Sequence, residues 1–290
     1  MSFAKQMINH GLVNIAKMVP SRLMKHWLFL LRSKPELTDR WGYHIRPIHY
    51  YEPLPDFCQI QPQQITRRRD YSTINFNLAQ QQELLRRLGG LYQSELASIA
   101  DKSAPEGFDF CNPYFAGLDA ALYYALIRDL KPKRIIEIGS GYSTRIAMKA
   151  LAVNAAEGRA GKMTCIEPYP EPRLTEAALE IELVQMCVED VGVEFFSQLS
   201  ANDILFIDSS HAASFGSDVC FELLELLPRL NSGVWVHIHD IFFPHDYPAE
   251  WLIQKRIAFN EQYLLEAFLS FNQSYSVQAA NYWLALEHSD

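Results

Sequence analysis

Two segments in the second half of the sequence place acidic and histidine side chains directly after apolar runs. Asp208 and His211 follow the run ending at position 207, and His239 and Asp240 close a run that begins at position 233. Carboxylate oxygens suit Mg²⁺ or Ca²⁺, and an imidazole of near-neutral pKa suits a base that deprotonates a hydroxyl. The types and spacing predict a site in which Asp208 and Asp240 hold a divalent cation while His211 acts on an acceptor hydroxyl.

Simpler interpretations of these two segments stay open. Asp208 could bond a cofactor or the end of the sheet without a metal, and Ser209 or Ser210 could cap the next helix. His237 and His239 alternate onto one face of the run and could be core histidines.

A glycine-rich turn upstream is a candidate cofactor site. Gly139-Ser140-Gly141 joins the apolar run 134–138 to a helical segment. Glycine there lets backbone N–H groups approach a ligand at the end of a parallel strand. Glu137 could hold the ammonium of an amino-acid ligand, whereas Thr144 stands where a dinucleotide fingerprint wants a small residue. The turn therefore favours S-adenosylmethionine (SAM) over NAD, and the absence of a following Gly-Lys-Ser/Thr excludes a P-loop.

Two further acids follow the next apolar runs. Glu167 lies 28 residues after Gly139 and is expected to reach ribose hydroxyls, with a solvent-exposed loop carboxylate as the alternative. Asp190 follows the run 180–186 and is a candidate acceptor for an adenine amino group.

From position 109 onward, short apolar runs alternate with amphipathic segments. This pattern predicts parallel strands joined by crossover helices, a doubly wound α/β fold over 109–290. The tail 275–287 holds two apolar runs split at Asn281, which we expect to add an antiparallel pair and complete a mostly parallel, seven-stranded sheet. The expected strands are 134–139, 162–168, 180–186, 203–208 and 233–240, and the expected helices are 117–130, 143–151, 218–230 and 260–271.

The first 108 residues are expected to form a separate extension of helices and loops. Helical spacing over 3–32 breaks at Pro20-Ser21, an aromatic loop spans 41–69, and helical spacing returns over 75–99. The residues up to Arg40 include seven basic and two acidic ones. Their net charge is +5, against −13 for the remainder of the chain. Residues 1–32 are predicted to lie on an anionic membrane surface, to cap the main domain or to form a dimer contact.

Composition excludes several classes of protein. A net charge of −8 argues against nucleic-acid binding. Charged residues interrupt the N-terminal apolar stretch, so neither a membrane span nor a secretory signal is expected. The five cysteines show no zinc or disulfide pattern. We expect a cytoplasmic protein that can associate peripherally with a membrane, and homo-oligomerisation stays open.

In this order, the segments KRIIEIGSGYST, CIEP, DILFIDSSH and GVWVHIHDIFFP resemble the class I SAM-dependent methyltransferases. The resemblance covers roughly Asn112 to the C-terminus and is strongest to sugar and small-molecule O-methyltransferases related to cephalosporin hydroxylase and rhamnosyl O-methyltransferase. It implies that Glu137, Gly139 and Gly141 form the first SAM motif, with Glu167 at the ribose and Asp190 near the adenine. In metal-dependent members, acids at the ends of the fourth and fifth strands hold the cation.

Residues and resemblance together predict an O-methyltransferase that acts on a hydroxyl of a small molecule or saccharide, with SAM and Mg²⁺ or another divalent cation as candidate cofactors. One alternative is a nicotinamide-dependent oxidoreductase, which Thr144 and the lack of an evident Tyr-x-x-x-Lys pair disfavour. The other is a non-catalytic protein of the same fold that serves as a scaffold at a membrane or glycan-assembly complex.

Overall fold

The structure, a computed structural model, describes residues 19–100, 108–170 and 181–287. The chain divides into two compact units, Met1–Ile60 and Gln61–Asp290. The helix expected before Pro20 lies outside the described residues. The division at Ile60 places the segment 61–100 in the same unit as the α/β core.

The first unit contains two short helices and an irregular aromatic segment. Helix α2 spans Ser21–Arg32 and helix α3 spans Pro35–Asp39, which confirms a helix after the break at Pro20. Pro35 occupies the first position of α3, where its missing N–H costs nothing. The described helices include none that is both long and apolar enough to cross a bilayer.

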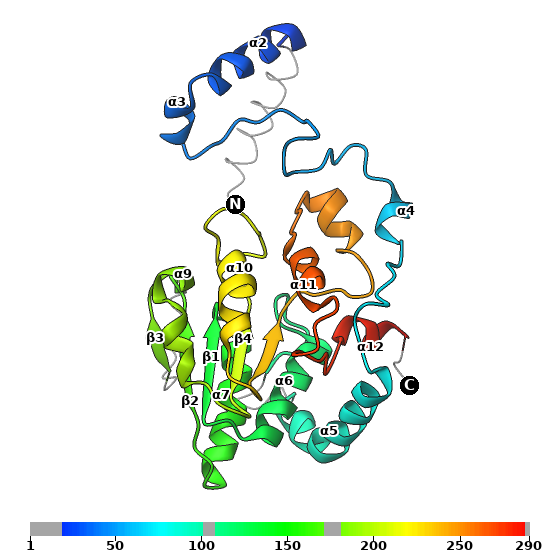
Figure 1. Cartoon of the computed structure of the whole chain (residues 1–290), viewed down its shortest axis with the longest axis vertical. Coiled ribbons are helices and arrows are strands. Elements are labelled where there is room, and N and C mark those ends of the chain that lie inside the picture. The colour runs from blue at the N-terminus through cyan, green and yellow to red at the C-terminus, as the bar shows by residue number, and fades with distance from the viewer. Residues whose placement is uncertain (1–18, 101–107, 171–180, 288–290) are drawn as a thin grey trace. The chain divides into compact units, whose positions relative to one another are not determined.

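A parallel sheet forms the centre of the second unit. Its strands are β1 (Arg134–Ile138), β2 (Lys162–Ile166), β3 (Glu182–Val184), β4 (Ile204–Ile207) and β5 (Trp235–Ile238). They lie in the order β3-β2-β1-β4-β5, as Figure 1 shows, with every neighbouring pair parallel. The order reverses beside β1, so the ends of β1 and β4 flank the crevice where ligands bind in such sheets.

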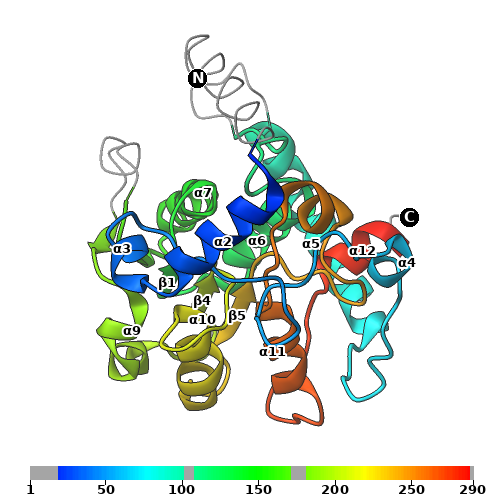
Figure 2. The same cartoon turned by 90° about the horizontal axis from the view of Figure 1, so that it is seen from above.

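Helices cover both faces of the sheet, as the view in Figure 2 shows. One face packs against α6 (Gly117–Leu130) and α7 (Tyr142–Ala156). The other packs against α11 (Glu261–Leu269) and against α10 (Asp218–Phe221), which a π-helical turn η2 (Glu222–Leu226) and a 3-10 turn η3 (Leu227–Arg229) continue. Because both faces of β1, β2 and β4 are buried, these strands read as nearly continuous apolar runs, and the doubly wound prediction is confirmed.

A buried arginine ties three helices together at the outer layer. Arg128 of α6 bonds Glu95 of α5 (Leu78–Ile99) at 2.8 Å and Glu157, just after α7, at 2.6 Å.

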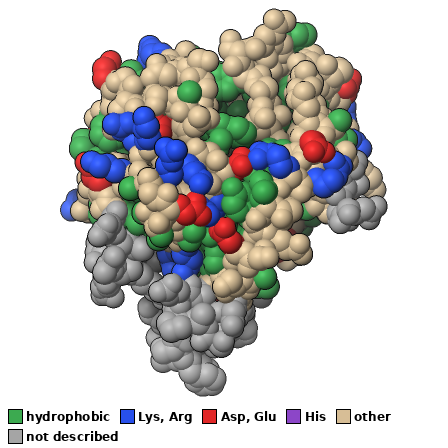
Figure 3. All heavy atoms as spheres, turned by 90° about the horizontal axis from the view of Figure 1, so that it is seen from below, with side chains coloured by type: hydrophobic (Ala, Val, Ile, Leu, Met, Phe, Trp, Pro, Cys, Tyr) green, Lys and Arg blue, Asp and Glu red, His purple; other side chains and the backbone are tan. Residues whose placement is uncertain are grey.

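On the face seen in Figure 3, basic and acidic side chains lie next to one another. The remaining short elements are α4 (Pro62–Ile65), α9 (Val188–Val191), η1 (Val193–Gln198) and η4 (Glu250–Lys255).

The prediction for the C-terminal tail is wrong. The described residues form five strands rather than seven, and Asn281–Glu287 is helix α12. A short apolar run fits a helix face as well as a strand, and here tertiary contacts decide. Trp283 packs edge-on against Phe76, and the Asn281 amide donates to Asp119 of α6 at 2.7 Å. No described strand therefore pairs with the outer edge of β5.

Candidate active site

The glycine turn connects β1 to α7, and its two glycines have different roles. Gly139 has a φ of +84°, and a Cβ there would lie 2.1 Å from the carbonyl oxygen of Asp208. A Cβ on Gly141 would meet no atom within 4 Å. Gly139 is thus required by the contact between the ends of β1 and β4, while Gly141 leaves open space for a ligand. The Gly141 N–H donates to Thr144 Oγ1 at 2.9 Å, which explains a threonine at this position.

Glu137 does not reach the crevice surface expected from the sequence. Its side chain is fully buried, accepts a hydrogen bond from the Ser143 hydroxyl, and lies 3.6 Å from the sulfur of Cys165. Burial raises the pKa of Glu137 to about 8, although the hydrogen bonds from Ser143 and Thr144 oppose the shift. The carboxyl group holds the start of α7 beneath the turn.

The other predicted cofactor residues lie along the same edge of the sheet. The Ser140 hydroxyl oxygen is buried and has no hydrogen-bond partner among the described residues. Glu167 directly follows β2, and one carboxylate oxygen accepts from the Tyr169 N–H at 2.8 Å. Asp190 lies exposed in α9, after β3. The structure places Glu137 at the end of β1 beneath the turn that holds Ser140 and Gly141, with Glu167 after β2 and Asp190 in α9.

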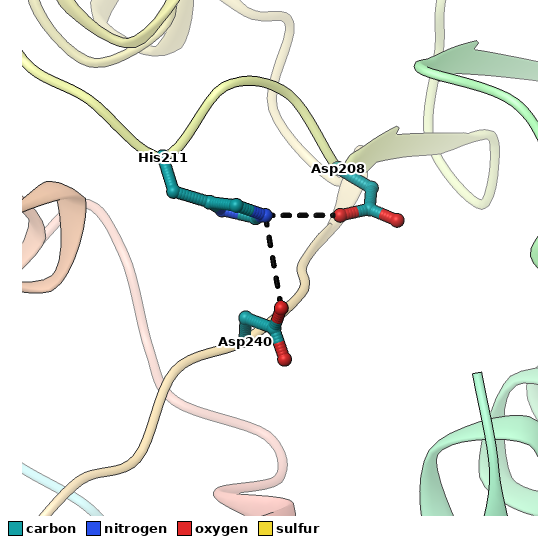
Figure 4. A group of neighbouring side chains, drawn as sticks. All are labelled: Asp208, His211 and Asp240. Atoms are coloured by element: carbon teal, nitrogen blue, oxygen red, sulfur yellow. Dashed lines mark ion pairs between the residues drawn. The ribbon is translucent and has the colours of Figure 1, made fainter. Parts of the chain in front are cut away.

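Asp208, His211 and Asp240 converge as the sequence predicts (Figure 4). The Nε2 atom of His211 lies 3.3 Å from Oδ1 of Asp208 and 3.7 Å from Oδ2 of Asp240. Since Gly139 touches the backbone of Asp208, this cluster adjoins the glycine turn. The two candidate sites therefore form one continuous region at the carboxyl ends of β1, β4 and β5.

Two residues of the cluster have a left-handed backbone conformation, which sets the direction of their side chains. His211 and Asp240 have φ values of +59° and +55°, in the left-handed region that costs most residues energy. The loop after β4 is held by Ser210, which donates to Asp218 at 2.6 Å, and by Ser209, which donates to Glu222 at 2.9 Å. These serines anchor the loop rather than cap a helix.

A residue that the sequence did not single out completes the cluster. Glu261, in the first turn of α11, is buried, and its Oε2 lies 2.7 Å from Nδ1 of His211. Burial alone would lower the pKa of His211, but hydrogen bonds to Asp208 and Glu261 outweigh it and raise the pKa to about 10. The surrounding carboxylates therefore favour the protonated form of the His211 imidazole.

The two aspartates respond differently to this environment. Burial opposes ionisation of Asp208, but the hydrogen bond from His211 and the nearby histidines lower its pKa. Burial is the largest influence on Asp240 and raises its pKa. One carboxylate is thus stabilised in its charged form by His211, and the other lacks sufficient compensating charge.

The donor set fits a divalent cation. One ligand atom from each of Asp208, His211 and Asp240 lies within 4.8 Å of the others. Asp208 and Asp240 supply the carboxylate oxygens that such cations prefer, and Nε2 of His211 lies beside both. A cation between Asp208 and Asp240 would also supply the positive charge that Asp240 lacks.

The two histidines at the end of β5, His237 and His239, lie among aromatic and backbone groups between the sheet and α6. Burial lowers the pKa of His237 to about 3, and its ring stacks on Phe206. Nε2 of His239 lies 3.2 Å from the Tyr114 carbonyl oxygen. Both line a cavity of about 990 Å³ between β5, α6 and the segment 274–282, which extends to Asp240. His239 also adjoins the cluster, because its Nε2 lies 3.5 Å from Oδ1 of Asp240.

Comparisons with known proteins identify the domain type. A family model described as "Methyltransferase domain" matches residues 136–241, which include the glycine turn and the Asp208–His211–Asp240 cluster. An uncharacterized protein from Archaeoglobus fulgidus is 32% identical over 194 residues, covering 60% of this chain and 83% of the archaeal protein.

One solved structure gives a weak likeness. It is a putative protein-L-isoaspartate O-methyltransferase from Plasmodium falciparum in complex with S-adenosyl-L-homocysteine, with 17% identity and a TM-score of 0.28. The match covers 43% of this chain and 62% of that one, and at this score it adds nothing to the argument. From the sequence relationship, the chain belongs to the family of the archaeal protein, and it carries a methyltransferase domain over residues 136–241.

Proposed function

We propose that the protein is a SAM-dependent O-methyltransferase that acts on a hydroxyl of a small molecule or saccharide with the help of a divalent cation. The observation that carries the proposal is the contact between Gly139 and Asp208, which puts an open glycine turn beside a cluster of two carboxylates and a histidine. A methyl transfer needs its donor and acceptor aligned at one place, and these adjoining sites meet that need.

The glycine turn is the proposed SAM site. Bound SAM would supply a methyl group on a sulfonium. The open space at Gly141 and the unpartnered hydroxyl of Ser140 fit a ligand with polar atoms close to the backbone. Glu137 contributes from below by fixing Ser143 and the start of α7, while Glu167 and Asp190 are the proposed contacts of the ribose and the adenine.

Asp208 and Asp240 are the proposed holders of the cation. A bound divalent cation lowers the pKa of a hydroxyl that it coordinates. His211 is the proposed base, because Nε2 faces both aspartates while Glu261 holds Nδ1. Its proton must leave before it can accept another, and positive charge between the two aspartates would weaken the interaction with Asp208 that helps to retain that proton.

The cavity beside β5 gives the acceptor room. Its volume of about 990 Å³ is on the scale of small-molecule sites, and it extends to Asp240 and His239. Its walls include many apolar side chains from α6 and β5, so the acceptor hydroxyl at Asp240 can belong to a molecule with an apolar portion.

Titration calorimetry tests the cofactor. We expect S-adenosylhomocysteine and SAM to bind and NAD to give no heat of binding. Tight binding of NAD without a response to either sulfur compound would overturn the proposal in favour of an oxidoreductase.

Measurements of metal binding and of turnover distinguish the proposed role of Asp240 from that of His211. Asp240→Asn should weaken Mn²⁺ binding, followed by electron paramagnetic resonance, whereas Asp129→Asn on the surface of α6 should not. His211→Ala should keep Mn²⁺ and S-adenosylhomocysteine but lose methyl transfer to a panel of diols and catechols by about 10²-fold or more. Loss of Mn²⁺ from His211→Ala would make His211 a ligand rather than the base, and unchanged turnover would exclude it from the mechanism.

A further inference from the structure

Helix α2 presents an apolar stripe to its surroundings, and none of its residues is buried. The stripe follows helical spacing, and the exposed fractions are 64% for Leu23, 58% for Trp27 and 47% for Leu30. No residue of α2 is buried. Isolated exposed leucines are ordinary, but a contiguous row with a tryptophan at its centre marks a surface that meets something else. Met24, Leu28 and Leu31 widen the stripe to nearly half of the helix circumference.

The charged side chains on the opposite side of α2 are all basic, and the exposed Phe29 lies among them. Arg22, Lys25 and Arg32 lie away from the stripe, and the twelve-residue helix contains no acidic side chain. The segment through Arg40 has a net charge of +5, although the whole chain has −8. Positive charge is therefore concentrated on the segment that also exposes the apolar stripe.

The irregular part of the same unit adds interfacial residue types. Trp41, Tyr43, Tyr50 and Tyr51 are between 58% and 80% exposed. Tryptophan and tyrosine favour the boundary between lipid headgroups and acyl chains, because they combine an apolar ring with a polar edge. Their exposure beside a basic helix is unusual for a surface that meets only water.

We propose that α2 lies on an anionic lipid surface, with Leu23, Trp27 and Leu30 inserted and the basic side chains at the headgroups. A strongly amphipathic helix with low overall hydrophobicity, a basic polar face and leucine and tryptophan on the other face binds in the plane of an interface. At about 18 Å α2 is too short to span a bilayer, but it is long enough to lie along its surface. This attachment is independent of the proposed catalysis.

Co-sedimentation of the full chain with vesicles tests the attachment. We expect binding to phosphatidylcholine vesicles that contain phosphatidylglycerol, weaker binding at high salt, and little binding to phosphatidylcholine alone. Neutralising two charges with Arg22→Gln and Lys25→Gln should weaken binding roughly 30-fold, since each basic residue near the surface contributes about 1 kcal/mol. The double variant Leu23→Ser, Trp27→Ser should weaken it by about tenfold or more.

Two exposed leucines of the second unit provide a matched control. Leu91 and Leu224 are each 58% exposed, like Trp27, so Leu91→Ser and Leu224→Ser remove comparable apolar surface elsewhere. These controls should bind vesicles as the unaltered chain does. Failure of the full chain to bind anionic vesicles at low salt, or equal binding by the Leu23, Trp27 variant, would overturn the proposal. The proposal would also be overturned if light scattering showed a dimer that the α2 variants dissociate while their vesicle binding stays unchanged. In that case α2 would contact a second copy of the chain.

Discussion

The Nδ1 atom of His211 lies 2.7 Å from Oε2 of Glu261, a residue 50 positions away in the sequence. The contact fixes the orientation of the imidazole, so that Nε2 faces Asp208 and Asp240. The main chain strengthens the link, because the Asn260 N–H donates to the His211 carbonyl at 3.1 Å. The start of α11 is thereby part of the site.

We predict that Glu261→Gln lowers the pKa of His211. The glutamine can still accept from Nδ1, but it lacks the charge that helps hold the pKa at about 10, so a fall of about 1–3 units is expected. Titration of the metal-free protein by NMR with ¹³C-labelled histidine rings measures it, with His211→Asn to assign the signal. Glu266→Gln on the same helix, whose carboxylate pairs with Arg69, should leave the titration unchanged. An unaltered pKa in Glu261→Gln would show that the charge of Glu261 has no influence on His211.

Glu261 marks the limit of what the sequence could predict at this site. An acid in the first turn of a helix is already favourable with the helix dipole, so it carries no signal of a second role. Asp208, His211 and Asp240 could be predicted, because residues at the ends of neighbouring parallel strands meet at one edge of the sheet. The partner of His211 comes from a helix whose packing only the folded structure specifies.

The sheet could be predicted from the sequence, whereas the C-terminal tail and the direction of Glu137 could not, because both depend on contacts with other elements. The apolar runs of β1 to β5 predicted the doubly wound sheet, because burial on both faces dictates them. The tail was misassigned, since contacts of Trp283 and Asn281 with distant residues select a helix over a strand. Glu137 was expected to face the ligand, but the alternation of β1 turns it under the turn towards Ser143, a position that the strand end alone does not reveal.

The two glycines of the turn should respond oppositely to alanine. Gly141→Ala should fold normally, since its Cβ meets nothing within 4 Å, but should weaken S-adenosylhomocysteine binding by about tenfold or more. Gly139→Ala should lower the free energy of unfolding by about 2–5 kcal/mol, because its Cβ would collide with the Asp208 carbonyl at a positive φ. Calorimetry and urea unfolding check the pair, with Gly90→Ala on the open surface of α5 as the control for both. Normal ligand affinity in Gly141→Ala would place the cofactor elsewhere.

Glu137 should make the stability of the fold depend on pH. Its pKa rises from 4.5 in the unfolded chain to about 8 in the folded one, so the folded state holds the proton more tightly. The stabilisation is complete below about pH 4.5 and is lost as the pH rises to about 8. Glu137→Gln keeps an acceptor for Ser143 without an ionisable group. Relative to the unaltered chain, the variant should therefore gain stability from pH 5 to pH 8, measured by urea unfolding. Parallel stability curves across this range would mean that Glu137 is not protonated in the fold.

Removal of the Arg128 side chain should destabilise the second unit more than removal of Arg87. Arg128 is 4% exposed and bonds Glu95 and Glu157, whereas Arg87 is 44% exposed and bonds Asp129. Arg128→Ala breaks several charge-assisted hydrogen bonds in a buried setting, and we expect a loss of about 2–4 kcal/mol in the free energy of unfolding. Arg87→Ala breaks a surface pair, for which about 1 kcal/mol or less is expected. Urea unfolding of the two variants measures the difference, and equal losses would show that burial adds nothing to the arginine that joins α5, α6 and α7.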